Sequence, residues 1–197
     1  MATTRERLKP GERKLQILQV LAQMLQHPKG ERITTASLAE MLDVSEAALY
    51  RHFASKAQMF EGLIEFIESS IFGLANKITA EQDNGLKQLY AVVAMLLGFA
   101  EKNPGMTRVL LGDALVNEDE RLQVRINQLM DRIEATLKQC LRVAATQGSP
   151  GDGSDADPGP RANLILCYVV GRWHQFAKSG FKRMPTDGLD RQWPLIA

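Results

Sequence analysis

Two short helical patterns meet at a tight turn between residues 34 and 56, and this stretch constrains the fold more than any other. Leu38 and Leu42 give the first pattern an apolar face, as one side of an amphipathic helix requires. The turn falls at Asp43, and Ser45 can cap the second pattern because its hydroxyl accepts a hydrogen bond from an unpaired amide. A helix, a short turn and a second helix with a polar outer face predict a helix-turn-helix.

Apolar residues recur at helical spacing through most of the remaining chain, and no stretch of length alternates as a strand does. The pattern opened by Ser55 runs without proline to about residue 79. The sequence predicts an all-α arrangement of about nine helices. Its two parts are a helix-turn-helix head over 1–54 and a helical dimerisation and partner-binding body over 55–197. Other expected helices cover 11–26, 86–102, 106–115, 118–146 and 163–181, and the chain ends in a short helix or apolar strap.

Two segments lack this periodicity. Residues 148–160 combine glycine, proline, serine and aspartate without apolar groups, so they are expected to form a flexible loop. Residues 1–10 are polar and basic, and they can be either a solvated tail or an arm that lies along phosphates.

Charge is unevenly divided along the chain. The net charge is +1, but residues 1–60 hold nine Lys and Arg against six Asp and Glu, whereas the remainder holds fifteen against seventeen. A mildly basic head on a mildly acidic body favours DNA contact at one end only.

Other chemistries have little support in the sequence. Cys140 and Cys167 lie in apolar helical patterns and are expected to be buried free thiols, with no metal-ligand spacing around them. The histidines are scattered, and no nucleophile, base and orienting group cluster, so no enzyme, metal or cofactor is predicted. No apolar run approaches a membrane span and no secretion signal is present, which favours a cytoplasmic protein.

The second helix of the motif carries the side chains expected to read DNA, because its first turns face the base edges. It is predicted over 46–52. Ala47 and Ala48 are small enough to let the backbone approach bases or thymine methyls. Side chains at 50–52 can reach phosphates or base edges, although the Tyr50 ring can also pack on the core. Leu49 and Phe53 lie four apart on one apolar face, and Phe53 is assigned to the core. The expected DNA-binding set is Thr34, Thr35, Ser45, Ala47, Ala48, Tyr50, Arg51, His52 and Lys56.

Three members of that set lie at helix starts. Thr34 and Thr35 can bond phosphates or serve only as helix caps. Lys56 suits a phosphate contact because positive charge and free amides coincide at the start of a helix.

Residues 44–56, Val-Ser-Glu-Ala-Ala-Leu-Tyr-Arg-His-Phe-Ala-Ser-Lys, resemble the signature of the TetR family of bacterial regulators. The resemblance implies a three-helix DNA-binding head, a helical C-terminal domain and a homodimer. Segments of the body, such as 103–105 and 125–129, resemble the nucleoid occlusion branch of that family. That branch implies binding to palindromic chromosomal sites, with one or two dimers on each. The DNA-bound protein would then engage the C-terminal tail of the division protein FtsZ and antagonise its polymers.

The same resemblance implies a partner surface between the long helix and the one after it. Its residues would be Phe66, Met95, Gly98, Lys102 and Asn103, each of which can also serve only packing, capping or solvation. Leu74 stands where the resemblance implies an arginine. The alternative function is a ligand-responsive TetR-type repressor, whose pocket would mix polar groups into the helices after residue 86; the sequence has few there.

Overall fold

The computed structural model describes residues 10–26, 33–148 and 157–196. Within these ranges the protein is all-α, with nine α-helices, one 3-10 helix and no strand. The predicted fold class is therefore confirmed. The prediction of a basic arm or solvated tail at 1–10 falls almost wholly outside the described residues, although α1 already begins at Pro10.

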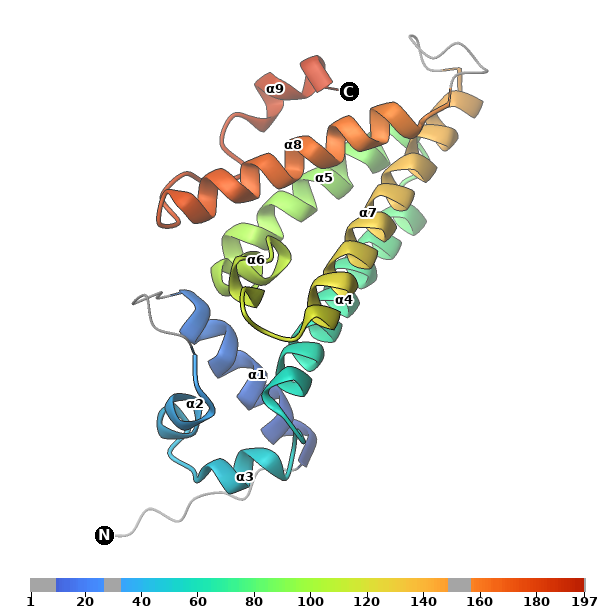
Figure 1. Cartoon of the computed structure of the whole chain (residues 1–197). Helices are drawn as coiled ribbons and strands as arrows, with labels where there is room; N and C mark the ends of the chain where they lie inside the picture. The colour runs from blue at the N-terminus through green and yellow to red at the C-terminus, as the bar shows by residue number, and fades with distance from the viewer. Residues whose placement is uncertain (1–9, 27–32, 149–156, 197) are drawn as a thin grey trace, which may run out of the picture.

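The head consists of three helices at one end of the molecule, in blue in Figure 1. They are α1 (Pro10–Gln26), α2 (Thr35–Met41) and α3 (Glu46–Tyr50). The fourth helix, α4 (Lys56–Glu81), leads away from the head along the body. Figure 1 thus shows one long helix joining the two parts, as the proline-free apolar pattern predicted.

The body is assembled around α5 (Gly85–Lys102), which packs against α4, α6, α7 and α8. The indole of Trp173 is fully buried and donates a hydrogen bond to the carbonyl of Leu96, 3.1 Å away. This bond ties α8 to the central helix. The other body elements are α6 (Pro104–Leu110), η1 (Asp113–Leu115), α7 (Glu120–Thr146), α8 (Gly159–Lys178) and α9 (Leu189–Ile196).

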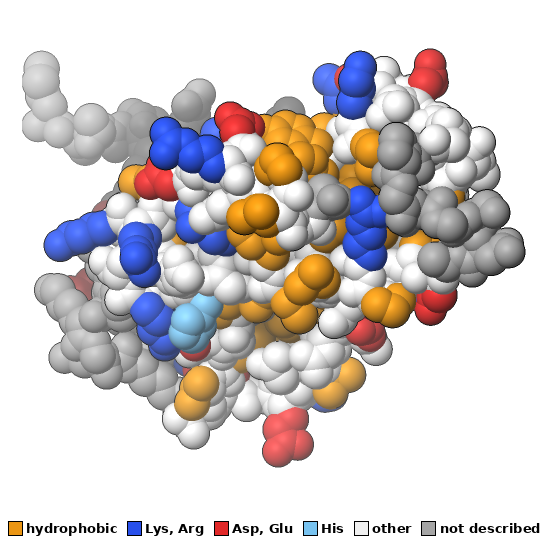
Figure 2. All heavy atoms as spheres, turned by 90° about the horizontal axis from the view of Figure 1, so that it is seen from above, with side chains coloured by type: hydrophobic (Ala, Val, Ile, Leu, Met, Phe, Trp, Pro, Cys, Tyr) orange, Lys and Arg blue, Asp and Glu red, His pale blue; other side chains and the backbone are white. Residues whose placement is uncertain are grey.

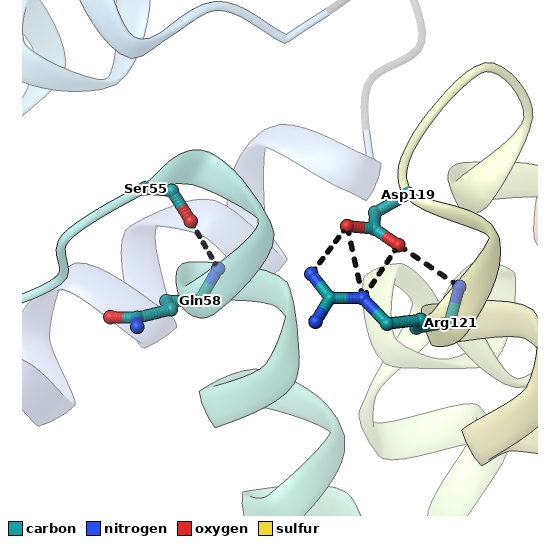
Figure 3. Close-up of polar contacts among 4 residues, drawn as sticks. All are labelled: Ser55, Gln58, Asp119 and Arg121. Atoms are coloured by element: carbon teal, nitrogen blue, oxygen red, sulfur yellow. Dashed lines mark hydrogen bonds and ion pairs between the residues drawn. The ribbon is translucent and has the colours of Figure 1, made fainter.

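Short polar side chains begin most of these helices. The hydroxyls of Ser45 and Ser55 accept the amides of Ala48 and Gln58 at 3.3 and 3.1 Å. The spacing of Ser55 and Gln58 is that of a reciprocal capping box, but the Gln58 side chain instead accepts the Ala54 amide at 2.9 Å. Figure 3 shows the Ser55 cap of α4 together with the Asp119 cap of α7.

Several predicted boundaries differ from the structure. Helix α3 ends at Tyr50, so Arg51 and His52 follow it rather than belong to it. Helix α8 starts at Gly159, inside the expected loop, because Pro160 takes a first-turn position where its missing N–H costs nothing. The rest of the predicted loop, at 149–156, lies outside the described residues.

The head and body share one connected cluster of buried apolar side chains. Gly105, at the start of α6, brings the body directly against α1. A Cβ atom built on Gly105 would lie 1.9 Å from the carbonyl oxygen of Ala22 and 3.2 Å from Cβ of Leu25. Only glycine permits this approach, so its role is set by packing between α1 and α6. Arg108 adds a hydrogen bond to the carbonyl of Leu25 at 3.3 Å.

One of the two thiol predictions is wrong. Cys140 is buried, and burial raises the pKa of its thiol to about 11. Cys167 is exposed on α8. The apolar residues around Cys167 recur at helical spacing, which indicated a buried face. In the folded single chain no other element covers Cys167.

Candidate DNA interface and partner surface

The start of α2 is fixed by a complete capping box. The Thr34 hydroxyl accepts the Ser37 amide at 3.0 Å, and the Ser37 hydroxyl accepts the Thr34 amide at 3.1 Å. Leu38 and Ala39 then bury one face of the helix. Asp43 adopts a left-handed conformation with φ of 52°, which an aspartate tolerates better than most residues. The chain therefore turns sharply into α3.

The second helix of the motif buries one side and exposes the other. Leu49 is inside the core, and Phe53, just beyond the helix, is buried as predicted. Ala47 and Tyr50 are exposed, whereas Ala48 is half-buried. Beyond the helix, Arg51 is exposed and His52 is half-buried. The exposed side of α3 therefore carries part of the set that the sequence assigned to base reading.

A hydrogen-bonded chain links the two helices of the motif across their outer side. Tyr50 donates its hydroxyl to Oγ1 of Thr35 at 3.4 Å, and Thr35 donates to Oε2 of Glu46 at 2.5 Å. Thr35 and Tyr50 are thus in direct contact, and Thr35 also bonds the carboxylate of Glu46, which was not assigned to this surface. No local pattern signals this contact, because it joins positions eleven residues apart on different helices.

Two lysines, one in α1 and one at the start of α4, make contacts within the protein. Lys14, which the sequence did not single out, places its ammonium 5.6 Å from the centroid of the Phe53 ring, just after α3. Lys56 is turned inward: its ammonium lies 2.5 Å from Oε1 of Glu118, in the connection before α7. Its phosphate role stays a prediction.

The residues expected to bind a partner lie on α4 and α5, which pack side by side. Phe66 is 37% exposed, a large value for a phenylalanine in the middle of a long helix. Leu74, two turns further along α4, is 46% exposed. Helix α4 therefore exposes apolar side chains to solvent.

On α5 the expected residues follow helical spacing. Met95 is half-buried, Gly98 has no neighbouring heavy atom within 4 Å of a Cβ built on it, and Lys102 is exposed. Asn103 caps the helix end, because its side-chain amide donates to the carbonyl of Phe99 at 2.8 Å. Capping is therefore one role of Asn103. The structure leaves open space at Gly98 and an exposed charge at Lys102, and the partner role of both residues stays a prediction.

The interior of the described ranges holds little that could serve a small polar ligand. The buried polar side chains there are Gln88 and Thr107. Gln88 donates to the carbonyls of Thr79 and Gln82, and Thr107 donates to that of Ala100 at 3.1 Å. Both are occupied by the protein's own backbone. In the same ranges no three His, Cys, Asp or Glu side chains gather as a metal site, and no helix is long and apolar enough to cross a membrane.

The fold and the motif define a class: an all-helical regulator with an N-terminal helix-turn-helix and a helical body. Comparisons with known proteins agree. Residues 24–63 match the bacterial regulatory proteins of the tetR family, and residues 83–197 match the SlmA-like group of tetracyclin repressor-like C-terminal domains.

Relatives resemble the chain over nearly its whole length. It is 51% identical to the nucleoid occlusion factor SlmA of Alteromonas mediterranea, over 94% of each chain. It is 50% identical to the SlmA of a Marinomonas species, over 96% of this chain and 95% of that one. The chain belongs to the SlmA family, within the TetR family of regulators.

Solved structures support the fold alone. The fatty acid degradation regulator FadR of Bacillus halodurans superposes with a TM-score of 0.80 at 14% identity, covering 97% of this chain and 96% of that one. The TetR family regulator PfmR of Thermus thermophilus gives 0.75 at 20% identity, covering 91% and 96%. These regulators therefore share the arrangement of helices in Figure 1.

Proposed function

We propose that this chain is a sequence-specific DNA-binding nucleoid occlusion factor. It binds palindromic sites on the chromosome as a homodimer, acts at the nucleoid in the cytoplasm, and while bound engages the C-terminal tail of FtsZ and antagonises FtsZ polymers. The observation that carries the proposal is the likeness to SlmA proteins at about 50% identity over the body as well as the head. Regulators that share only the fold fall to 20% identity or less.

For DNA reading we propose that α3 enters the major groove with its exposed side. Ala47 and Ala48 would lie against bases, while Tyr50, Arg51 and His52 would reach base edges or the backbone. Thr34, Thr35 and Ser45 stand at the starts of α2 and α3, where unpaired amides favour phosphate. The Tyr50–Thr35–Glu46 chain supports this geometry because it holds the two helices in register.

For the dimer we propose that the outer side of α8 meets its copy. Leu164 is 55% exposed, and Cys167 and Gly171 are exposed at the same helical spacing. Figure 2, which views the molecule from above, shows apolar side chains exposed at several places on that face. A packed dimer would cover them and would set two recognition helices about 34 Å apart, the span of one DNA turn.

For the partner surface we propose α4 and α5, with Phe66 as an apolar anchor and Lys102 as the cation that meets an acidic peptide. Gly98 supports this surface because open space there leaves room for a peptide backbone. Met95 and Asn103 would line the same surface. The exposed Leu74 makes the far end of this surface on α4 apolar rather than charged.

The test is sedimentation of FtsZ polymers with this protein, in the presence and absence of its DNA site. The expected result is that DNA-bound protein sediments with FtsZ and shortens or disassembles the polymers more than free protein does. Phe66→Ala or Lys102→Glu should lose this effect and keep DNA affinity, whereas Lys87→Glu, on an exposed lysine at the other end of α5, should keep both. If DNA-bound protein neither associates with FtsZ nor alters its polymers, the proposal fails. A ligand-responsive repressor then becomes the better account, and release of DNA by a small molecule would identify it.

A further inference from the structure

The ammonium of Lys56 is held by the body of the protein. Its Nζ atom lies 2.5 Å from Oε1 of Glu118, and the two side chains are only 21% and 9% exposed. The same ammonium lies 5.7 Å from the centroid of the Phe60 ring. A nearby pair, Arg121 with Asp119, is 77% and 32% exposed. The Lys56–Glu118 pair is therefore shielded from water and salt in a way that the Arg121–Asp119 pair is not.

This pair sits where the head meets the body. Lys56 is the first residue of α4, directly after the recognition unit, and Glu118 precedes the Asp119 cap of α7. Figure 3 shows the first turns of both helices at this junction. Further along, Arg125 of α7 bonds Glu68 at 2.9 Å and the carbonyl of Glu61 at 3.4 Å. Ion pairs thus join α4 to the connection before α7 at its first turn and to α7 itself further along.

We propose that Lys56 and Glu118 form a positioning pair that fixes the angle of the recognition unit on the body and so sets the half-site spacing that a dimer accepts. This inference rests on the part of the proposed function in which a dimer reads a palindrome. The Glu118 carboxylate is almost fully buried, so removal of the Lys56 ammonium would leave a buried charge without its partner cation, which is strongly destabilising at this junction. Lys56 therefore acts on the angle of the recognition unit through Glu118.

The consequence for DNA selection is geometric. One extra base pair between half-sites moves the second half-site by about 3.4 Å and turns it by about 35°. Recognition units that are locked to a dimeric body cannot follow this displacement, so the longer site binds weakly. Units released from the Glu118 contact can tilt toward it while α1 stays packed against α4 and α6, and the preference for the native spacing falls.

The experiment uses the full-length protein and the palindrome that it selects from a random DNA pool. Fluorescence anisotropy measures affinity for this palindrome and for a version with one base pair inserted at its centre, each over a range of salt concentrations. The variants are Lys56→Met, which keeps the apolar stem, Glu118→Gln, the double variant and the charge exchange Lys56→Glu with Glu118→Lys. Arg121→Ala is the matched control, because it removes an exposed ion pair from the same turn.

The expected result is that each single variant and the double variant reduce the preference for native spacing by a similar factor, at least threefold. The charge exchange restores at least part of the preference, and Arg121→Ala leaves it unchanged. In Glu118→Gln the slope of affinity against salt stays that of the unmodified protein.

The inference is overturned if Lys56→Met flattens the salt slope by about 1.8, the value expected when each of two subunits neutralises one phosphate fewer, while Glu118→Gln keeps full spacing preference. If Lys56→Met does not fold, Glu118→Gln and the charge exchange decide the matter, since their side chains stay close in size. The unmodified protein is tested for FtsZ binding on the native site, so failure of the proposed function is visible separately.

Discussion

Replacement of Gly105 by alanine should destabilise the protein, although alanine is the better helix former. The new Cβ would lie 1.9 Å from the carbonyl oxygen of Ala22, an atom of α1 that cannot rotate away. Overpacking of this kind costs about 1–3 kcal/mol, and a backbone contact puts Gly105→Ala near the upper end. Alanine recovers up to about 1 kcal/mol of helix propensity. The net loss is about 2 kcal/mol.

Gly98→Ala and Gly73→Ala are controls with the opposite sign. Both glycines lie inside helices, and a Cβ built on either has no heavy atom within 4 Å apart from its chain neighbours and the nearby backbone of its own helix. Each substitution should stabilise by about 0.5–1 kcal/mol, because glycine loses more backbone entropy in a helix than alanine does.

Urea unfolding and calorimetry check all three variants. For a domain of this length about 1 kcal/mol shifts the Tm by roughly 2–4 °C. The Tm of Gly105→Ala should therefore fall by about 4–8 °C, while the controls rise by about 1–4 °C. Should Gly105→Ala match the controls in stability, α1 and α6 do not approach each other as described, and the close packing of head on body is refuted.

Three further predictions concern other surfaces. Leu164→Glu should convert a dimer into a monomer in sedimentation velocity, with helical circular dichroism unchanged, because a carboxylate would enter the α8 contact; a persisting dimer would rule out that face. Ala47→Trp should abolish site-specific DNA binding while the protein stays folded, and normal affinity would remove Ala47 from the interface. Hydrogen bonds from the Arg121 side chain and backbone lower the pKa of Asp119 to about 2. The stabilisation by Asp119 is therefore present above its ordinary pKa and is lost as the pH falls toward 2. The advantage of the native protein over Asp119→Asn in urea unfolding should shrink between about pH 4 and pH 2, and a constant advantage would contradict it.

Features set by neighbours in sequence were predictable. Ser45 and Ser55 cap their helices because the bond closes within three residues, and apolar spacing placed Leu49 and Phe53 in the core correctly. The stretch after Ser55 forms α4 because it has no proline and its apolar residues recur at helical spacing, both of which are visible in the local sequence.

Features set by distant partners were not predictable from one sequence. Glu118 lies 62 residues beyond Lys56, and no local pattern links them. Cys167 was misplaced because helical periodicity indicates that a face is apolar, but not whether the same chain or another molecule covers it. The proposed contacts with DNA and with a partner are of the same kind. Exposure of Tyr50 or Phe66 describes the surface of this chain and does not identify the molecule that binds there.

The close approach at Gly105 bears on how a protein of this kind can be divided. Helix α1 is covered on one side by α4, where a Cβ on Gly62 would touch Leu18 and Phe53, and on another by α6. A fragment cut after residue 54 would leave Leu18 and Leu25 without these neighbours. The DNA-binding head is therefore not a module that can be transferred to another protein by itself. A hybrid that joins this head to a different body should fold only if it also inherits α6 and its glycine.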